Sequence, residues 1–257
     1  MTTKTLTKEA LSVIDHYQHF KFGNAVCSVP YFNNKIARQR AGLRVNIGKG
    51  SPEEILDEVQ TIKLKNHVDA DLITSETLKK LLVDNNIGID CSGFAYYVLN
   101  AESEALQKGR LSRKLRFMNC RGIFGKVYCW LRPVANCDVA TLANTKNSRV
   151  VRLIDIKPGD MITMIDREKS SRNHILIIDR VEMETSIPSK VYYSHAVAYP
   201  EDGLYGSGIK QGMIEITNPD ASIIGQRWSE NGKFAEENRI FVRAQQSNTE
   251  IRRLNWF

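Results

Sequence analysis

Hydrophobic residues in the first part of the chain recur with the period of an α-helix. In residues 7–20, apolar side chains at positions 11, 13, 14, 17 and 20 would share one helical face. A second helix is predicted to begin at Ser51-Pro52-Glu53-Glu54, which combines an N-cap serine, proline at the first helical position and a glutamate that closes a capping box. A third amphipathic helix is predicted over residues 74–83.

The second half of the chain has the patterns of β-strands. Lys157-Pro158-Gly159 is a turn signal, and the mostly apolar segment that follows it, residues 160–165, predicts a strand. Residues 174–178 form a nearly continuous apolar run, which is typical of a strand buried on both faces. Further strands are predicted at residues 190–198, 212–217 and 239–244. Because helices come first and strands later, the order favours a single elaborated α+β domain over residues 1–257, with an antiparallel sheet.

Composition narrows the class of protein. The 257 residues are 42% hydrophobic and 25% charged, so the chain can bury a core and wholesale disorder is excluded. No apolar run reaches the roughly 18–20 residues that a membrane-spanning helix needs. The N-terminus has no apolar signal-peptide core, which predicts a cytoplasmic protein unless export is unconventional. The five cysteines, at positions 27, 91, 120, 129 and 137, include no C-x-x-C pair, so we expect reduced thiols and no structural zinc site.

The positive charge is concentrated in one segment. The chain carries a net charge of +7, and residues 101–153 alone hold 11 Lys and Arg against 3 Asp and Glu. One interpretation is a surface that binds an anionic partner, which could be nucleic acid, a different anionic polymer or membrane headgroups. The other is an ordinary solvated helix face. Since no nucleic-acid recognition motif accompanies the charge, nucleic acid is the less favoured partner.

The segment Gly88-Ile-Asp-Cys-Ser-Gly-Phe94 would place a cysteine at the start of a helix. Asp90 is a good N-cap residue, so Cys91 falls at the first helical position. Unpaired backbone N–H groups and the helix dipole favour a thiolate there, and the same N–H groups would stabilise an oxyanion. The small residues Ser92 and Gly93 would let a substrate approach. The alternative is a buried structural cysteine.

A nucleophilic cysteine needs a base, and the base needs an orienting partner. His174 opens one predicted strand, and His195 lies in another strand 21 residues later. Neighbouring antiparallel strands would bring the two imidazoles together. The alternative for each histidine is a plain packing or surface role.

Four segments in a fixed order carry a resemblance to a known family. Asp90-Cys91-Ser92-Gly93-Phe94, Pro158-Gly159-Asp160, Asn173-His174 and Ser194-His195-Ala196 together resemble the NlpC/P60 family of papain-like cysteine peptidases, over residues 84–200. The resemblance implies a papain-like α+β fold in which the nucleophile helix packs on an antiparallel sheet. It also implies that residues 101–153 are a basic insertion and that residues 201–257 add C-terminal strands.

The resemblance assigns roles to individual residues. Cys91 would be the nucleophile, His174 the general base and His195 the partner that orients His174. Tyr31, in Val29-Pro30-Tyr31, looks like the tyrosine of the family's Pro-Tyr segment, which borders the active site. We place it with Asp90 and Ser92 among the substrate-binding residues.

The sequence departs from the family at two places. His174 is followed by Ile175-Leu176 instead of Val-Gly, and Asn33-Asn34 replaces the glycines that follow the Pro-Tyr segment. These changes bear on substrate identity.

The leading hypothesis is a cysteine peptidase or amidase that needs no metal or organic cofactor and cleaves peptide or isopeptide bonds, with bacterial cell-wall peptides as the first candidate substrate. The alternatives are acyl transfer to an amine or alcohol on the same fold, and a non-catalytic module that binds an anionic polymer through residues 101–153.

Overall fold

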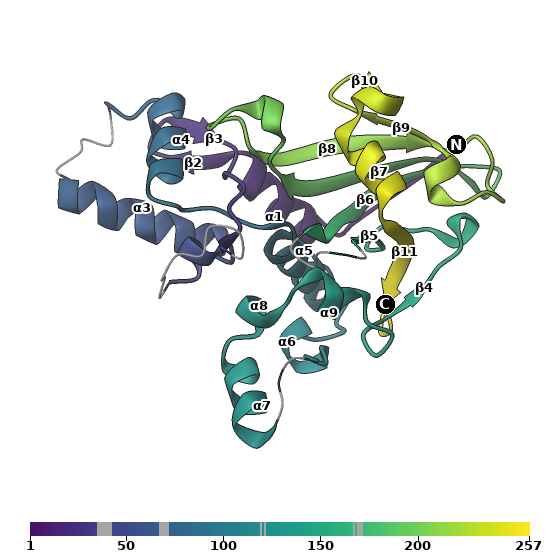
Figure 1. The fold of residues 1–257 in the computed structure, drawn as a ribbon, viewed down its shortest axis with the longest axis horizontal. Coiled ribbons are helices and arrows are strands. Elements are labelled where there is room, and N and C mark those ends of the chain that lie inside the picture. The colour runs from purple at the N-terminus through teal and green to yellow at the C-terminus, as the bar shows by residue number, and fades with distance from the viewer. Residues whose placement is uncertain (35–42, 67–71, 119, 121, 167, 169–171) are drawn as a thin grey trace.

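The computed structural model describes residues 1–34, 43–66, 72–118, 120, 122–166, 168 and 172–257. Its centre is a nine-stranded sheet in the order β10-β9-β8-β7-β6-β5-β11-β4, with β1 paired to β6 (Figure 1). Each strand pairing is antiparallel. The α+β class predicted from the order of elements is therefore confirmed. The strands of this sheet are β1 (Thr2–Thr5), β4 (Ser148–Val150), β5 (Met161–Ile165), β6 (His174–Glu184), β7 (Ile187–Val197), β8 (Gly208–Glu215), β9 (Arg227–Glu230), β10 (Lys233–Phe234) and β11 (Asn248–Leu254).

The sheet is covered on both faces, as the apolar run at the start of β6 predicts. Ile175 and Ile177 belong to the core that the sheet shares with the N-terminal helices. Leu176 and Ile178, which point the opposite way along the same strand, belong to a second core that includes Trp228. Because both faces of β6 are packed, a strand with no polar side is stable here.

The first core is built around α5 (Cys91–Ala105). Helix α1 (Lys8–Gln18) packs against it, and the rings of Tyr17 and Phe94 meet edge to face with centroids 5.7 Å apart. The predicted capping box is present at the start of the next helix, where the Glu54 amide donates to Ser51 Oγ (3.2 Å) and the Ser51 amide to Glu54 Oε2 (2.9 Å). The other elements on this side are β2 (Phe20–Phe22), β3 (Ala25–Cys27), α3 (Pro52–Asn66) and α4 (Ser75–Asp84).

The second core contains the clearest error of the strand prediction. Residues 239–244 were predicted as a strand, but they lie in helix α10 (Arg239–Gln246). The Asn238 side chain caps this helix by accepting hydrogen bonds from the amides of Ile240 and Phe241. Ile240 and Ala244, one helical turn apart, are its buried residues. A cap and a single buried turn outweigh the β propensity of this short apolar run.

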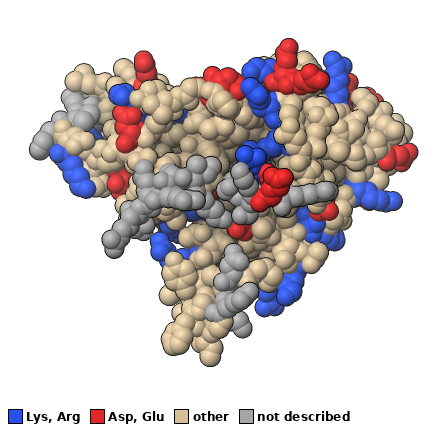
Figure 2. Space-filling model, viewed as in Figure 1, with Lys and Arg blue, Asp and Glu red and all other residues tan. Residues whose placement is uncertain are grey.

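The basic segment folds into a lobe of short helices that extends away from the sheet (Figure 1). We call the helices α6 (Leu111–Lys114), α7 (Gly122–Leu131), α8 (Pro133–Asn136) and α9 (Val139–Ala143) the basic lobe. In Figure 2 its tip is mostly tan, with Lys and Arg side chains along the flank that leads to the body.

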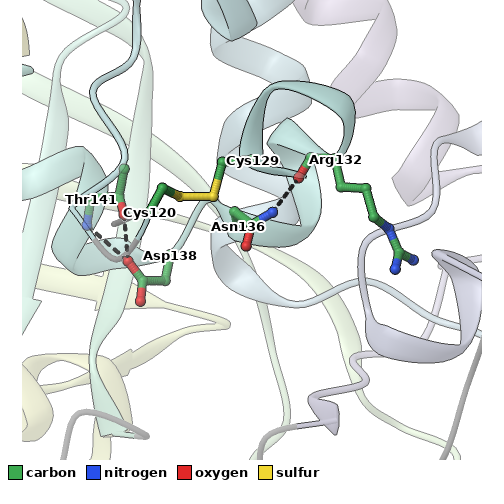
Figure 3. The surroundings of a disulfide bond; sticks show 6 residues. All are labelled: Cys120, Cys129, Arg132, Asn136, Asp138 and Thr141. Carbon is green, nitrogen blue, oxygen red and sulfur yellow. Dashed lines mark hydrogen bonds between the residues drawn. A yellow bond between two sulfur atoms is a disulfide. The ribbon is translucent and has the colours of Figure 1, made fainter. Parts of the chain in front are cut away.

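A disulfide joins Cys120 to Cys129 of α7 (Figure 3), so the expectation that all cysteines are reduced is wrong for this pair. Cys27, Cys91 and Cys137 are free. A nine-residue spacing does not reveal such a pairing, because the distance between the two thiols depends on how the lobe folds. Within the part of the chain that the structure describes, we find no helix with both the length and the apolar character needed to cross a membrane.

Candidate active site

Cys91 lies at the tip of α5, at the first helical position, as the sequence predicts. Asp90 has extended backbone angles, and its Oδ1 accepts a hydrogen bond of 2.6 Å from the Gly93 amide. Because this bond joins residues only three apart, local sequence is sufficient to place the cysteine at the helix tip.

A buried lysine, which the sequence analysis did not identify, holds this helix tip. Lys49 is 5% exposed, and its Nζ donates hydrogen bonds to Asp90 Oδ1 (2.9 Å), Ser92 Oγ (2.6 Å) and the Cys137 carbonyl oxygen (2.8 Å). The sequence shows Lys49 only within Gly48-Lys49-Gly50, whose spacing does not fit a phosphate-binding loop. Its partners lie 41 to 88 residues away, so no local pattern reveals them.

These contacts bear on the predicted substrate-binding residues. Asp90 and Ser92 are both buried, and their side-chain oxygens are bonded to Lys49 and to each other. The geometry gives both residues a structural part at the helix tip, while contact with a substrate stays a prediction. Gly93 serves packing as well, since a Cβ there would lie 2.8 Å from the carbonyl oxygen of Gly48.

The structure brings the two predicted histidines together in adjacent strands. Nε2 of His174, at the start of β6, lies 2.7 Å from Nδ1 of His195 in β7, and both rings are buried. This bond engages Nε2 of His174 and not Nδ1. The bond to His195 therefore uses one nitrogen of His174 and leaves the other for proton transfer.

Glu230 and Tyr199 extend this chain of hydrogen bonds. His195 Nε2 lies 2.8 Å from Glu230 Oε2, and the Tyr199 hydroxyl donates to Glu230 Oε1 at 2.6 Å. Burial raises the pKa of the Glu230 carboxyl, but the charge interaction with His195 and the hydrogen bonds outweigh it, so its pKa lies below the usual value. An ionised Glu230 accepts the Nε2 proton of His195. His195 Nδ1 then accepts the Nε2 proton of His174, which leaves Nδ1 of His174 as a base.

The Cys91 sulfur lies against the backbone on both sides of His174. Sγ is 3.9 Å from the Asn173 carbonyl oxygen, and the Ile175 amide also hydrogen-bonds to the sulfur. The helix tip and the start of β6 thus meet, with the sulfur against the backbone of the residues that flank His174.

The charge state of Cys91 differs from the sequence expectation. Burial raises the pKa of its thiol to about 12, and the Asp90 carboxylate acts in the same direction. Burial also lowers the pKa of His174 well below its ordinary value, and the charge of Arg243 adds to that effect, as would a protonated His195. At neutral pH the resting pair is therefore a neutral thiol and a neutral imidazole. Desolvation of the buried sulfur therefore opposes the thiolate that the helix tip favours.

Tyr31 borders this site. A parallel β-bridge pairs Tyr31 with Ile89, two residues before Cys91. Burial raises the pKa of the Tyr31 hydroxyl, and the charge of a Cys91 thiolate would raise it further. The location agrees with the predicted position of Tyr31 at the edge of the active site.

Arg243 of α10 adds a second positive charge to the site, beside that of Lys49. Its guanidinium donates a hydrogen bond of 2.6 Å to the Arg172 carbonyl oxygen, two residues before His174. The same charge lowers the pKa of the Cys91 thiol and that of His174. Arg243 could not be assigned to the site from the sequence, because the pattern of its segment predicts a strand.

We expect Arg243→Gln to slow alkylation of Cys91 at a given pH by roughly threefold to tenfold, as expected for loss of one nearby charge. Removing the cation raises the pKa of the thiol, so the rise of alkylation rate with pH moves to higher pH. The measurement is the rate of iodoacetamide labelling between pH 6 and 10, with Arg239→Gln on the same helix as control. Identical profiles for the two variants would contradict this role of Arg243.

If Cys91 and His174 act as nucleophile and base, we expect Glu230→Gln to lower kcat by about 100-fold or more, because an amide cannot hold His195 in the required tautomer as the carboxylate does. Steady-state kinetics on the variant measure this effect. The exposed Glu236→Gln is the control and should retain full activity. A Glu230→Gln enzyme with unchanged kcat would remove Glu230 from the catalytic chain.

Comparison of this chain with protein-family models, curated proteins and solved structures finds no match. The resemblance to the NlpC/P60 family therefore stays a prediction that rests on the motif residues.

Proposed function

We propose that this protein is a cysteine hydrolase of the NlpC/P60 type, with a papain-like fold and Cys91 as nucleophile. The observation that carries the proposal is the meeting of the α5 tip with the start of β6, where Cys91 Sγ lies 3.9 Å from the carbonyl oxygen of the residue before His174. The hydrogen-bonded series from His174 through His195 to Glu230 supports it, because it orients and polarises the base.

The neutral resting pair determines how the reaction begins. Nδ1 of His174 removes the Cys91 proton as the sulfur attacks the amide carbonyl carbon, forming a C–S bond. The oxyanion that develops on the substrate is stabilised by the backbone N–H of Cys91 at the helix tip. The imidazolium of His174 then protonates the leaving amine, the C–N bond breaks and a thioester remains. Neutral His174 next activates water, which hydrolyses the thioester and restores the thiol.

The substrate class follows from the family resemblance. NlpC/P60 peptidases act on peptide and isopeptide bonds, so bacterial cell-wall peptides are the substrate that we propose. Helix α5 packs on the antiparallel strands β6 and β7 with its tip at the site, which is the arrangement expected of a papain-like nucleophile helix.

Selective labelling tests the proposal before the natural substrate is known. Burial raises the pKa values of both Cys91 and Cys137 to about 12, so burial alone gives the two thiols similar reactivity. We expect iodoacetamide to label Cys91 at least tenfold faster than Cys137, as read by peptide mass mapping, because His174 serves as a base for Cys91. His174→Ala should remove this advantage. Equal labelling of the two cysteines, or no effect of His174→Ala, would refute the assignment.

The dependence of kcat/KM on pH below neutrality gives a further test of the proposal. Because the pKa of His174 lies well below 6.5, the base stays unprotonated as pH falls through that value. We therefore expect kcat/KM at pH 6 to remain close to its value at pH 7. A loss of activity centred at pH 6.5 would show that the base is a histidine with an ordinary pKa.

A further inference from the structure

Helix α7, at the tip of the basic lobe, presents large apolar side chains to solvent. The exposed fraction is 92% for Phe124, 79% for Ile123, 66% for Trp130 and 65% for Leu131. Val127 and Tyr128 on the same helix are about half exposed. A contiguous group of apolar side chains exposed to solvent on a protein surface marks an interaction site.

The exposed residues form one continuous face. At about 100° per residue, the six side chains fall within about 160° of the helix circumference. The opposite side carries Gly125 and the buried Cys129, which the disulfide ties to Cys120 (Figure 3). A Cβ on Gly125 would lie 3.3 Å from the Cys120 backbone, so this side of the helix is closely packed. The disulfide therefore holds α7 with its apolar face outward.

The surroundings of α7 are basic. Arg113, Lys114 and Arg116 of the neighbouring segment are exposed. The three acidic residues of positions 101–153 are engaged within the protein: Glu102 accepts hydrogen bonds from Thr7, Glu104 pairs with Arg110, and Asp138 caps α9 through Thr141. The view in Figure 2 shows no Asp or Glu at the tip of the lobe.

A cavity adjoins the exposed helix. It has a volume of about 790 Å³, and its lining combines the apolar Leu115, Phe117 and Trp130 with the basic Arg113, Arg116 and Lys146. A lining of this mixed kind suits a molecule with an acyl chain and an anionic headgroup.

We infer that the basic lobe docks the protein on an anionic lipid bilayer, with α7 lying in the interface between headgroups and acyl chains. The aromatic side chains of Phe124, Tyr128 and Trp130 are suited to that depth, and the neighbouring cations complement anionic headgroups. Ten residues of helix extend only about 15 Å, half the thickness of the hydrocarbon core, so α7 lies on the membrane and does not cross it. This inference does not depend on the reactivity of Cys91.

Vesicle binding of the full chain tests the inference. We expect the protein to sediment with vesicles of phosphatidylcholine containing 30% phosphatidylglycerol, and at least tenfold less with phosphatidylcholine alone. Phe124→Asp should lower binding at least tenfold, and so should the double change Arg113→Glu with Arg116→Glu. Leu64→Asp and Lys65→Glu, at exposed positions of α3, are matched controls that should bind as the unchanged protein does.

Fluorescence reports the depth of α7 directly. Trp130 is exposed, whereas Trp228 is buried and Trp256 is partly buried against the first core. Insertion should therefore shift the emission maximum to shorter wavelength, and Trp130→Phe should remove the shift while preserving binding. Unchanged labelling of Cys91 in each variant shows that the fold is intact.

Binding that is absent, equal on both vesicle types or equally weakened by the α3 controls would overturn the inference. So would Phe124→Asp converting an oligomer to a monomer without a change in vesicle binding, because the apolar face would then cover a protein partner.

Discussion

Replacing Cys91 with alanine is expected to abolish hydrolysis, with kcat lower by about 10⁴-fold or more, while the fold is retained. In the proposed mechanism the sulfur is the atom that forms the thioester, and the neighbouring Ser92 hydroxyl is bonded to Lys49 and Asp90. The change removes one buried atom, so the free energy of unfolding should fall by only about 1 kcal/mol. Initial rates on cell-wall peptides, together with urea unfolding, measure both effects.

The matched control for this experiment is Cys137→Ala. Cys137 is also free and buried, and its carbonyl oxygen touches the same Lys49 that bonds to Asp90. A general effect of removing a buried thiol near the helix tip would appear in both variants. Full activity in Cys137→Ala and none in Cys91→Ala supports a chemical role for Cys91. Comparable activity in the two would exclude Cys91 as the nucleophile.

Replacing Lys49 with methionine is expected to lower the free energy of unfolding by about 3–5 kcal/mol, the usual cost of breaking a buried ion pair. The Asp90 carboxylate would remain buried with its cation removed, and the Cys137 carbonyl would lose its donor. Loss of Lys49 would also weaken the N-cap of α5. We therefore expect iodoacetamide to label Cys91 no faster than Cys137 in this variant. Urea unfolding followed by circular dichroism measures the first effect.

Two further variants make this prediction specific. Lys80→Met breaks the exposed pair with Asp84 and should leave the unfolding midpoint unchanged, because solvent screens that pair. Adding Asp90→Asn to Lys49→Met should recover part of the lost stability, since the uncompensated charge is then gone. If Lys49→Met and Lys80→Met behave alike, the buried pair does not hold the helix tip.

The parts of the site that were predictable from sequence depend on short-range geometry. Asp90 caps α5 through a residue three positions later, and Ser51 and Glu54 form a capping box across the same distance. His174 and His195 could be expected together because consecutive strands of an α+β fold usually pair. Each of these contacts joins residues within one helical turn or on two neighbouring strands, so the local sequence is sufficient to predict it.

The parts that were missed depend on separate segments. Glu230 is 35 residues from His195, and Lys49 is 41 residues from Asp90. Arg243 reaches the site only because residues 239–246 form a helix where a strand was predicted. The disulfide between Cys120 and Cys129 likewise depends on the fold of the basic lobe.

The sequence by itself determined which side chain stands at the tip of α5 and which imidazoles pair in the neighbouring strands, because capping bonds and strand pairing are local relations. Only the tertiary structure decided the protonation state of Cys91. Desolvation comes from all the segments that enclose the sulfur, and it outweighs the field of one helix end. The outward apolar face of α7 also depends on tertiary structure, because the same hydrophobic residues would form a buried helix if a neighbouring segment covered them.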